Sequence, residues 1–225
     1  MGGRGASSKI PTAHPGGGGG GGNASFTGGV GAPITTLKAA LGKKGAPMSM
    51  ATAVTGANPN YSGDYKEFSE NCQRAVIAYE ARRRGYNVTA LPTYEGDNLP
   101  RQAWHNKDGS RNGHWMGAFK NAKSEHIKAS TPQAMEKELN AKMASYGNGS
   151  RAIIAFGWKR GNSGHVVNVE HKNGKTYFND AQIGAKYKPK ELFSAIKGGT
   201  LDVVRTDNLK LSDRAKKSVT TAYNK

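Results

Sequence analysis

Cysteine is nearly absent from this sequence, which contains only Cys72 among its 225 residues. A single cysteine excludes an internal disulfide and a zinc site built from several cysteines. It fits a reducing compartment, or a protein that does not need disulfides for stability. Cys72 is then either a buried, inert thiol or a reactive one, and the rest of the sequence has to distinguish the two.

Long apolar runs are also absent. No stretch approaches the ~18 consecutive apolar residues that a membrane span needs, so we expect none. Met1 is followed by glycine and proline rather than by an apolar segment, so we expect no secretory signal. The location stays open between a phage particle, secretion and delivery into a bacterial cytoplasm.

Acidic residues are scarce, and none precedes Asp64. The chain has 33 lysines and arginines against 16 aspartates and glutamates, which gives a formal net charge of +17. Such a charge favours an acidic partner, such as an acidic target protein, a phage capsid surface or nucleic acid. The lysines are scattered and form no recognisable nucleic-acid-binding motif, so solubility is the simpler explanation of the charge.

Large apolar residues are rare in residues 1–60, which are rich in glycine and include an unbroken glycine run over 16–22. A segment of this composition cannot bury enough apolar surface to offset its ordering entropy. We therefore predict a flexible, basic arm over 1–60 and a folded domain over 61–225. Within the arm, residues 34–45 predict a short helix ending at Gly42, either a docking peptide or a transient helix.

The predicted domain combines helices with strands. Apolar spacing and capping residues predict helices over 72–84, 131–145, 189–196 and 212–223. Strand-forming residues predict strands over 88–91, 151–158, 165–170, 175–180 and 201–205. Asn173-Gly174 is the typical two-residue turn of a β-hairpin, and a helix followed by a mostly antiparallel sheet indicates an α+β fold.

Cys72 opens the first of these helices, behind a predicted N-cap at Asn71 or Ser69. At that place a thiol meets the positive end of the helix dipole and several N–H groups without intrahelical partners. Both favour the thiolate, which is the nucleophilic form. At the other end of the helix, the run from Arg82 to Arg84 precedes Gly85 and predicts a solvated helix end.

His165 opens a strand directly after a loop rich in glycine, and Asp180 ends the strand that follows it. In a regular hairpin, partners lie symmetrically about the Asn173-Gly174 turn, which puts Asp180 opposite Val167. A diagonal neighbour two residues away lies within side-chain reach on the same face. Asp180 is therefore predicted to hold the imidazole of His165, and Gln182 would point the same way if the strand continues.

A thiol, an imidazole and a carboxylate in this arrangement are the groups of nucleophilic catalysis. His165 would take the proton of Cys72, Asp180 would fix the imidazole tautomer, and backbone N–H groups at the helix start would serve as oxyanion donors. Taken singly, each residue has a simpler explanation as a small buried side chain or a turn residue. Taken together, they favour a catalytic site.

Three segments resemble the papain-fold toxin domains, often described as glutamine deamidases. They are Asn71-Cys72 with the helix and extended segment that follow, Gly164–Val169, and Asp180-Ala181-Gln182. The resemblance spans roughly residues 65–206 and implies that the domain over 61–225 is a papain-like catalytic domain. Its fold would be the papain-like cysteine-enzyme fold, with an N-terminal catalytic helix packed on a mostly antiparallel sheet. It implies Cys72 as nucleophile, His165 as base and Asp180 as the orienting group, with Gln182 and Asn71 as accessory residues for the oxyanion or the substrate.

We therefore expect a cysteine-dependent hydrolase that deamidates a glutamine side chain of a target protein, as a toxin or effector with an immunity protein as partner. The same groups would cleave a peptide or isopeptide bond or pass the acyl group to an amine, and only the resemblance favours deamidation. The alternative is a non-catalytic basic protein that attaches to nucleic acid or to a phage capsid. No cofactor is expected, and no metal site either, because no pair of histidines has ligand spacing beside acidic or cysteine neighbours.

Overall fold

The computed structural model describes residues 36–93 and 114–222. Its helices are α1 (Leu37–Leu41), α2 (Met50–Ala57), α3 (Lys66–Ser69), α4 (Cys72–Arg83), α5 (Pro132–Ser145) and α6 (Pro189–Ala195), with the 3-10 helices η1 (His114–Ala118) and η2 (Asp213–Lys217). Its strands are β1 (Val88–Ala90), β2 (Glu125–His126), β3 (Arg151–Gly157), β4 (Gly164–Lys172), β5 (Lys175–Asp180), β6 (Ala185–Tyr187), β7 (Asp202–Arg205) and β8 (Val219–Thr221). The predicted α+β class is confirmed.

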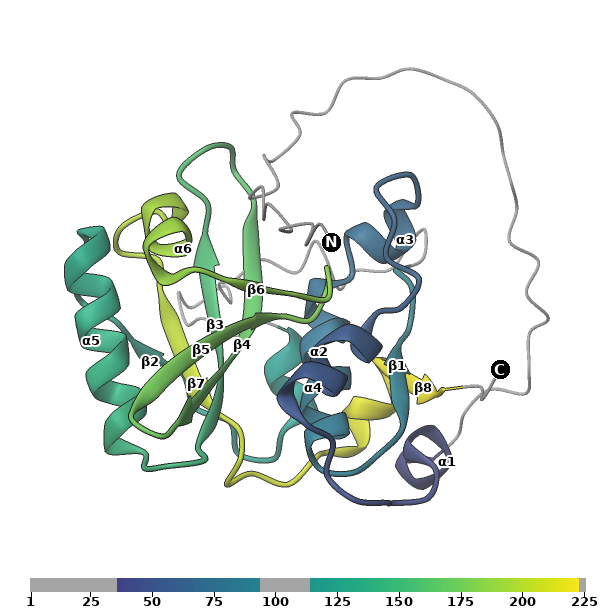
Figure 1. Ribbon diagram of the computed structural model, residues 1–225. Helices are drawn as coiled ribbons and strands as arrows, with labels where there is room; N and C mark the ends of the chain where they lie inside the picture. Colours follow the sequence, from purple (N-terminus) through teal and green to yellow (C-terminus); the bar gives the residue numbers. More distant parts are fainter. Residues whose placement is uncertain (1–35, 94–113, 223–225) are drawn as a thin grey trace, which may run out of the picture.

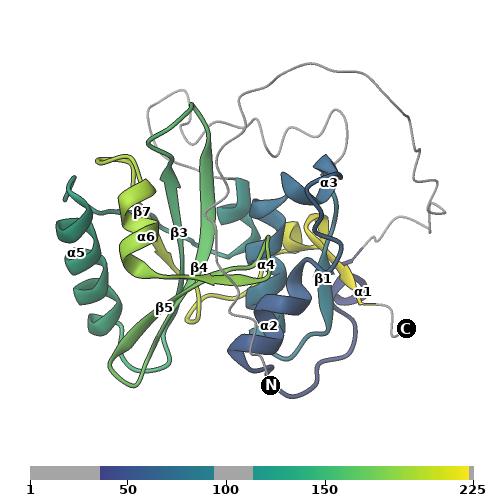
Figure 2. The ribbon, with the colours of Figure 1, turned by 45° about the horizontal axis from the view of Figure 1, so that its top comes forward.

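The main sheet has the strand order β2-β7-β3-β4-β5-β6, and β1 and β8 form a separate two-stranded sheet. All pairings between these described strands are antiparallel. Helices α5 and α6 cover one face of the main sheet, and α4 lies on the other side with α2 against it (Figures 1 and 2). The sheet is therefore the middle layer between two groups of helices.

The alternation of residues along β4 explains why both faces of the sheet are covered. Val167 and Val169 belong to the apolar cluster on the α5 and α6 side, whereas Val166 belongs to the cluster on the α4 side. Neighbouring residues in a strand point to opposite faces, so a strand with apolar residues at successive positions needs a layer on each face. These two clusters form the core of the described chain.

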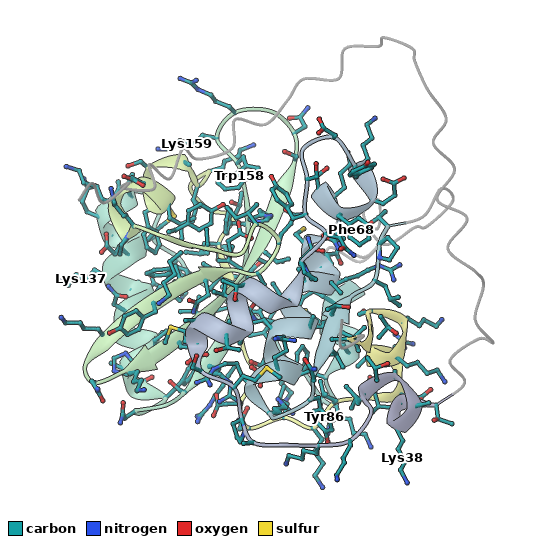
Figure 3. All side chains as sticks on the ribbon, turned by 45° about the vertical axis from the view of Figure 1, so that its right-hand side comes forward. Lys38, Phe68, Tyr86, Lys137, Trp158 and Lys159 are labelled. Atoms are coloured by element: carbon teal, nitrogen blue, oxygen red, sulfur yellow. The ribbon has the colours of Figure 1, made fainter. Side chains whose placement is uncertain are left out.

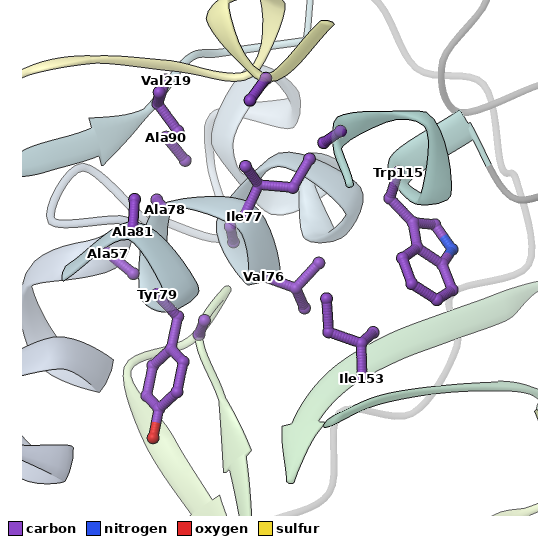
Figure 4. Close-up of a cluster of buried hydrophobic side chains, with 14 of the residues drawn as sticks. Ala57, Val76, Ile77, Ala78, Tyr79, Ala81, Ala90, Trp115, Ile153 and Val219 are labelled. Atoms are coloured by element: carbon purple, nitrogen blue, oxygen red, sulfur yellow. The ribbon is translucent and has the colours of Figure 1, made fainter. Parts of the chain in front are cut away.

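Helix α4 lies at the centre of the larger cluster. Its residues Val76, Ile77 and Tyr79 are almost fully buried, and Figure 4 shows Val76 directed toward Ile153 of β3, with Trp115 of η1 beside them. A helix that is buried nearly all round is fixed by packing rather than by its own helix propensity. This packing fixes where α4 begins, and therefore where its first residue lies.

The C-terminal end of α4 corrects the prediction of a solvated run of arginines. Arg82 is buried and donates to the backbone oxygen of Val88 at 3.0 Å. Arg83 pairs with Glu170 of β4, its Nη2 lying 2.9 Å from Oε2, and Arg84 donates to Glu80 at 2.8 Å. Carboxylates supplied by the sheet and by α4 itself compensate the charges of Arg83 and Arg84, and polar oxygens accept from Arg82, so the run can lie largely inside the fold.

Residues 36–60 differ from the predicted flexible arm. Thr36 caps α1, which ends at Gly42 as the sequence predicts, and Ser49 caps α2. Ala53 and Ala57 of α2 have no exposed surface and pack in the α4 cluster. The packed part of the chain therefore includes this segment, while residues 1–35 lie outside the described residues.

The C-terminal segment also differs from its prediction, which was one basic helix over 212–223. Ser212 caps only the short η2, and the chain then forms β8, which pairs with β1 from Val88↔Thr221 to Ala90↔Val219. The β-branched residues of Val219–Thr221 favour a strand over a helix. Pairing with β1 satisfies the backbone of both short strands.

No helix among the described residues is long and apolar enough to cross a membrane. Within 36–93 and 114–222, no group of three or more histidine, cysteine, aspartate or glutamate residues is placed to hold a metal ion.

Candidate active site

Cys72 is the first residue of α4, and its thiol is free and only partly buried. Asn71 occupies the N-cap position, as one of the two predicted caps, and its backbone oxygen accepts from Arg74 and Ala75. Its side chain makes no capping bond, because it is engaged elsewhere. The thiol thus sits where N–H groups without intrahelical acceptors point outward.

The hairpin of β4 and β5 has the predicted register, with Asn168 opposite Asn179 and Lys172 opposite Lys175. As a result, the imidazole Nε2 of His165 lies 2.8 Å from Oδ2 of Asp180, and both side chains are buried. The predicted contact between these two side chains is confirmed, because a two-residue turn fixes the register of everything that follows it.

Cys72 lies close enough to His165 for its side chain to contribute to the electrostatics of the imidazole. Since Nε2 is directed at Asp180, the other ring nitrogen, Nδ1, is the one available to the thiol. Burial lowers the pKa of His165, but the charge and hydrogen bond of Asp180, with a further contribution from Cys72, outweigh it and raise the pKa to about 10. The imidazole is therefore held as an imidazolium between a sulfur and a carboxylate.

Asp180 is fully engaged as an acceptor. Its Oδ2 also accepts from the hydroxyl of Tyr187 at 2.7 Å, and its Oδ1 accepts from the backbone N–H of Gln182 at 2.9 Å and of Ile183 at 3.4 Å. Burial alone would raise the pKa of this carboxyl, but His165 and these donors lower it overall. Asp180 is thus ionised and fixed in place. Sequence inspection missed Tyr187, which lies on β6 beyond the hairpin and carries no motif.

Two aromatic side chains, Trp158 and Phe156, pack against the imidazole of His165. The ring of Trp158 is stacked on His165 with centroids 5.6 Å apart and planes 21° apart. Phe156 meets both rings edge-on. Trp158 follows β3, and Figure 3 shows it toward the same end of the molecule as Phe68 of α3 and away from Tyr86. Such packing restricts imidazole rotation.

A cluster of three amide side chains lies next to Cys72. Asn71 Nδ2 donates to Asn58 Oδ1 at 2.9 Å and to the backbone oxygen of Leu91 at 3.2 Å. Gln182 Nε2 donates to the backbone oxygen of Ser69 at 2.9 Å. Both N–H groups of the Asn71 amide are therefore already used inside the fold.

Gln182 does not extend the strand as predicted. β5 ends at Asp180, and the chain turns through residues 181–184 into β6. The Asp180 carboxylate accepts from the N–H groups of this turn, which stops the strand there. Gln182 is therefore brought toward α3 and α4 by the turn and not by strand alternation.

A cavity of about 670 Å³ lies elsewhere, between α5 and the strands β5 and β6. Its lining includes Asn140, Lys175 and Tyr177, and it does not include Cys72, His165 or Asp180. Tyr187 is the one lining residue that also bonds to Asp180.

The described site brings together a thiol at a helix start and a buried imidazolium that is hydrogen-bonded to a buried carboxylate, and the thiol contributes to the raised pKa of the imidazole. No curated protein and no solved structure matches the chain. A family model described as papain fold toxin 1, glutamine deamidase, matches residues 70–185, which is just over half of the chain and includes Cys72, His165 and Asp180. The chain belongs to the papain-fold toxin family whose members are described as glutamine deamidases.

Proposed function

We propose that the protein is a cysteine-dependent glutamine deamidase that acts as a toxin on a protein target. Cys72 is the nucleophile, His165 the general acid and base, and Asp180 the group that orients the imidazole. The observation that carries this proposal is the series Cys72–His165–Asp180, with an imidazole pKa raised to about 10. An imidazolium beside a thiol stabilises the thiolate. The family match adds the preference for a carboxamide substrate.

The reaction follows from these groups. The Cys72 thiolate attacks the carboxamide carbon of a glutamine side chain, and the C–N bond of the tetrahedral intermediate breaks. Ammonia leaves with a proton from His165, and a thioester remains. Water then attacks the thioester carbon and gives its proton to His165, the C–S bond breaks, and the product is a glutamate side chain. Asp180 holds His165 in the same orientation through both steps.

The developing oxyanion needs donors close to Cys72. Backbone N–H groups at the start of α4 are suited to this role, because they lack intrahelical acceptors and are fixed by the helix. The side chain of Asn71 already donates both of its N–H groups to Asn58 and Leu91. We therefore assign Asn71 to the support of the site and not to the oxyanion.

The target is a protein that carries the glutamine on an accessible segment. The net charge of +17 favours an acidic surface on this target, and equally on an immunity protein that would cover Cys72 in the producing cell. Binding through such a surface weakens as salt rises, because the Debye length shrinks to about 3 Å at 1 M salt. The dissociation constant of a target, once identified, should therefore increase steeply with salt.

The test uses dialysed lysates of bacterial and animal cells as substrate. Wild-type protein and the Cys72→Ala variant are incubated with each lysate, and released ammonia and peptide masses are measured. Deamidation requires a gain of about one mass unit at a glutamine, present only with the wild type. Cleaved peptides would identify a protease instead, and new glutamine–amine links would identify acyl transfer. Equal products with both proteins would refute a role for Cys72.

A further inference from the structure

The side chain of Asn58 connects the two halves of the candidate site. Asn58 follows α2 directly, at its C-cap position, and is 5 % exposed. Its Nδ2 lies 2.9 Å from the backbone oxygen of Phe68, 3.1 Å from Asn71 Oδ1 and 2.9 Å from the backbone oxygen of Gln182. Its Oδ1 accepts from Asn71. Two N–H groups are thus shared among three acceptors, and both ends of the amide are used.

These partners lie next to the reactive groups. Asn71 immediately precedes Cys72, and the N–H of Gln182 donates to Asp180 Oδ1 at 2.9 Å. Cys72 and Asp180 belong to α4 and β5, elements that are not consecutive in the chain. Asn58 therefore ties the start of α4 to the turn that fixes Asp180. A second tie, from Gln182 Nε2 to the oxygen of Ser69, joins the same two segments.

We propose that Asn58 is a positioning residue, which sets the placement of Cys72 relative to the His165–Asp180 pair. This proposal rests on the function proposed above. Asn58 lies outside the matched residues 70–185, so α2 adds to the site a part that the family match does not include. A displacement of about 1 Å in such a site can cost ~100-fold in rate, because attack needs aligned groups.

The amide is required by the chemistry of its partners. A carboxylate at position 58 would keep the shape of the side chain but would face three oxygen acceptors, two of them backbone oxygens, without a donor. The Asn58→Asp variant therefore repels the groups that the amide joins. The Asn58→Ser variant keeps one donor on a shorter side chain and should lose only part of the effect.

The experiment compares both variants with Val54→Ala as matched control. Val54 is also buried on α2 and packs in the α4 cluster, and it is not among the residues that bond within the amide cluster. Its truncation removes packing without removing an amide. Three properties are measured: kcat and KM for glutamine deamidation, the rate of Cys72 alkylation by iodoacetamide, and the NMR titration of the His165 imidazole.

For Asn58→Asp we expect kcat to fall ~100-fold with KM nearly unchanged. The titration of His165 should move below its wild-type pKa of about 10, because the contribution of the Cys72 contact is lost. Alkylation should slow at least ~10-fold relative to Val54→Ala, because the sulfur is no longer held beside the imidazolium. For Asn58→Ser we expect values of kcat, alkylation rate and His165 pKa between those of Asn58→Asp and Val54→Ala.

The alkylation and titration do not depend on the substrate, so they test the positioning role even if deamidation is not the reaction. The proposal is overturned if Asn58→Asp matches Val54→Ala in both measurements. It is also overturned if neither Asn58 variant folds while Val54→Ala does, because Asn58 would then serve the stability of the fold and not the geometry of the site.

Discussion

Tyr187 offers the sharpest test of how the fold holds Asp180 ionised. Its hydroxyl donates to Oδ2, the same oxygen that lies 2.8 Å from His165. Tyr187→Phe removes this donor and leaves the ring in place. The exposed fraction of Tyr187 is only 8 %, so water cannot readily replace the lost hydroxyl. The change therefore isolates one hydrogen bond to a buried carboxylate.

The expected loss of stability in Tyr187→Phe follows from the kind of bond removed, which is a hydrogen bond to a charged carboxylate. A hydrogen bond to a charged group contributes about 1.5–3 kcal/mol, and one pKa unit corresponds to about 1.4 kcal/mol. Tyr187→Phe should therefore raise the pKa of Asp180 and lower the free energy of unfolding at pH 7 by about 1.5–3 kcal/mol. The carboxyl stays ionised at neutral pH, because its pKa starts below the ordinary value.

The sign of the pH dependence is fixed by the direction of the shift. A carboxyl with a lowered pKa in the folded state stabilises the fold above its unfolded pKa, and this stability is lost as the pH falls through the folded pKa. The difference between wild type and Tyr187→Phe should thus be full at pH 7 and shrink in acid. Wild-type acid unfolding should begin at a lower pH than that of the variant.

The assay is urea unfolding of both proteins between pH 3 and pH 7, with Tyr177→Phe as control. Tyr177 lies on the neighbouring strand β5, is partly exposed, and its ring contacts Lys186. If Tyr187→Phe lowers the free energy of unfolding at pH 7 no more than Tyr177→Phe does, the hydroxyl of Tyr187 does not stabilise the ionised Asp180. Acid unfolding of Tyr187→Phe that begins at the same pH as that of wild type would refute the assignment of the effect to Asp180.

Three further results are expected. Asp180→Asn should lower the pKa of His165 from about 10 toward its ordinary value near 6.5, seen by NMR, and should reduce kcat by ~100- to 10,000-fold, since the imidazole loses its orienting group. The stability that the raised pKa of His165 confers should be complete below about pH 6.5 and disappear as the pH rises through about 10. The difference in unfolding free energy between wild type and His165→Gln should therefore become smaller in alkali. A difference that does not change with pH would contradict the ion pair of His165 with Asp180. Glu170→Gln should cost about 3–5 kcal/mol in urea unfolding because it leaves the largely covered guanidinium of Arg83 without its buried carboxylate, whereas the His165 titration should stay unchanged.

The sequence could predict the part of the site that depends on local rules. Asn173-Gly174 specifies a two-residue turn, and the turn specifies the pairing of every residue beyond it. For that reason the contact of His165 with Asp180 could be predicted by counting residues on each side of the turn. The position of Cys72 at a helix start could be predicted from the N-cap residue types that precede it. By contrast, the contact between Cys72 and His165 depends on how α4 packs on the sheet, and no sequence pattern carries that information.

Contacts between distant segments set the limit of sequence prediction elsewhere. Arg83 and Arg84 look like a solvated helix end because charged side chains at helix ends usually are. Their side chains are only 17 % exposed because Glu170 and Glu80 pair with them, and Glu170 is supplied by β4, 87 residues further along the chain. A local window around Arg83 contains its charge but not its partner, whereas Glu80, the partner of Arg84, lies only four residues away. Asn58 resembles Arg83 in this respect, because its acceptor on Gln182 is 124 residues away.

The prediction of a flexible arm was wrong for residues 36–60, because the small glycine and alanine residues of this segment allow close packing against other elements. A Cβ at Gly56 of α2 would collide with the guanidinium of Arg82 on α4. Gly85, whose φ is +98°, approaches Gly45 so closely that a Cβ would collide with the Gly45 oxygen. A segment rich in glycine and alanine cannot form an apolar core by itself. Its small side chains still allow its backbone to pack closely against a core formed by other elements. Helix α2 therefore reaches α4 closely enough for Asn58 to bond beside Cys72, which a segment of larger side chains would prevent.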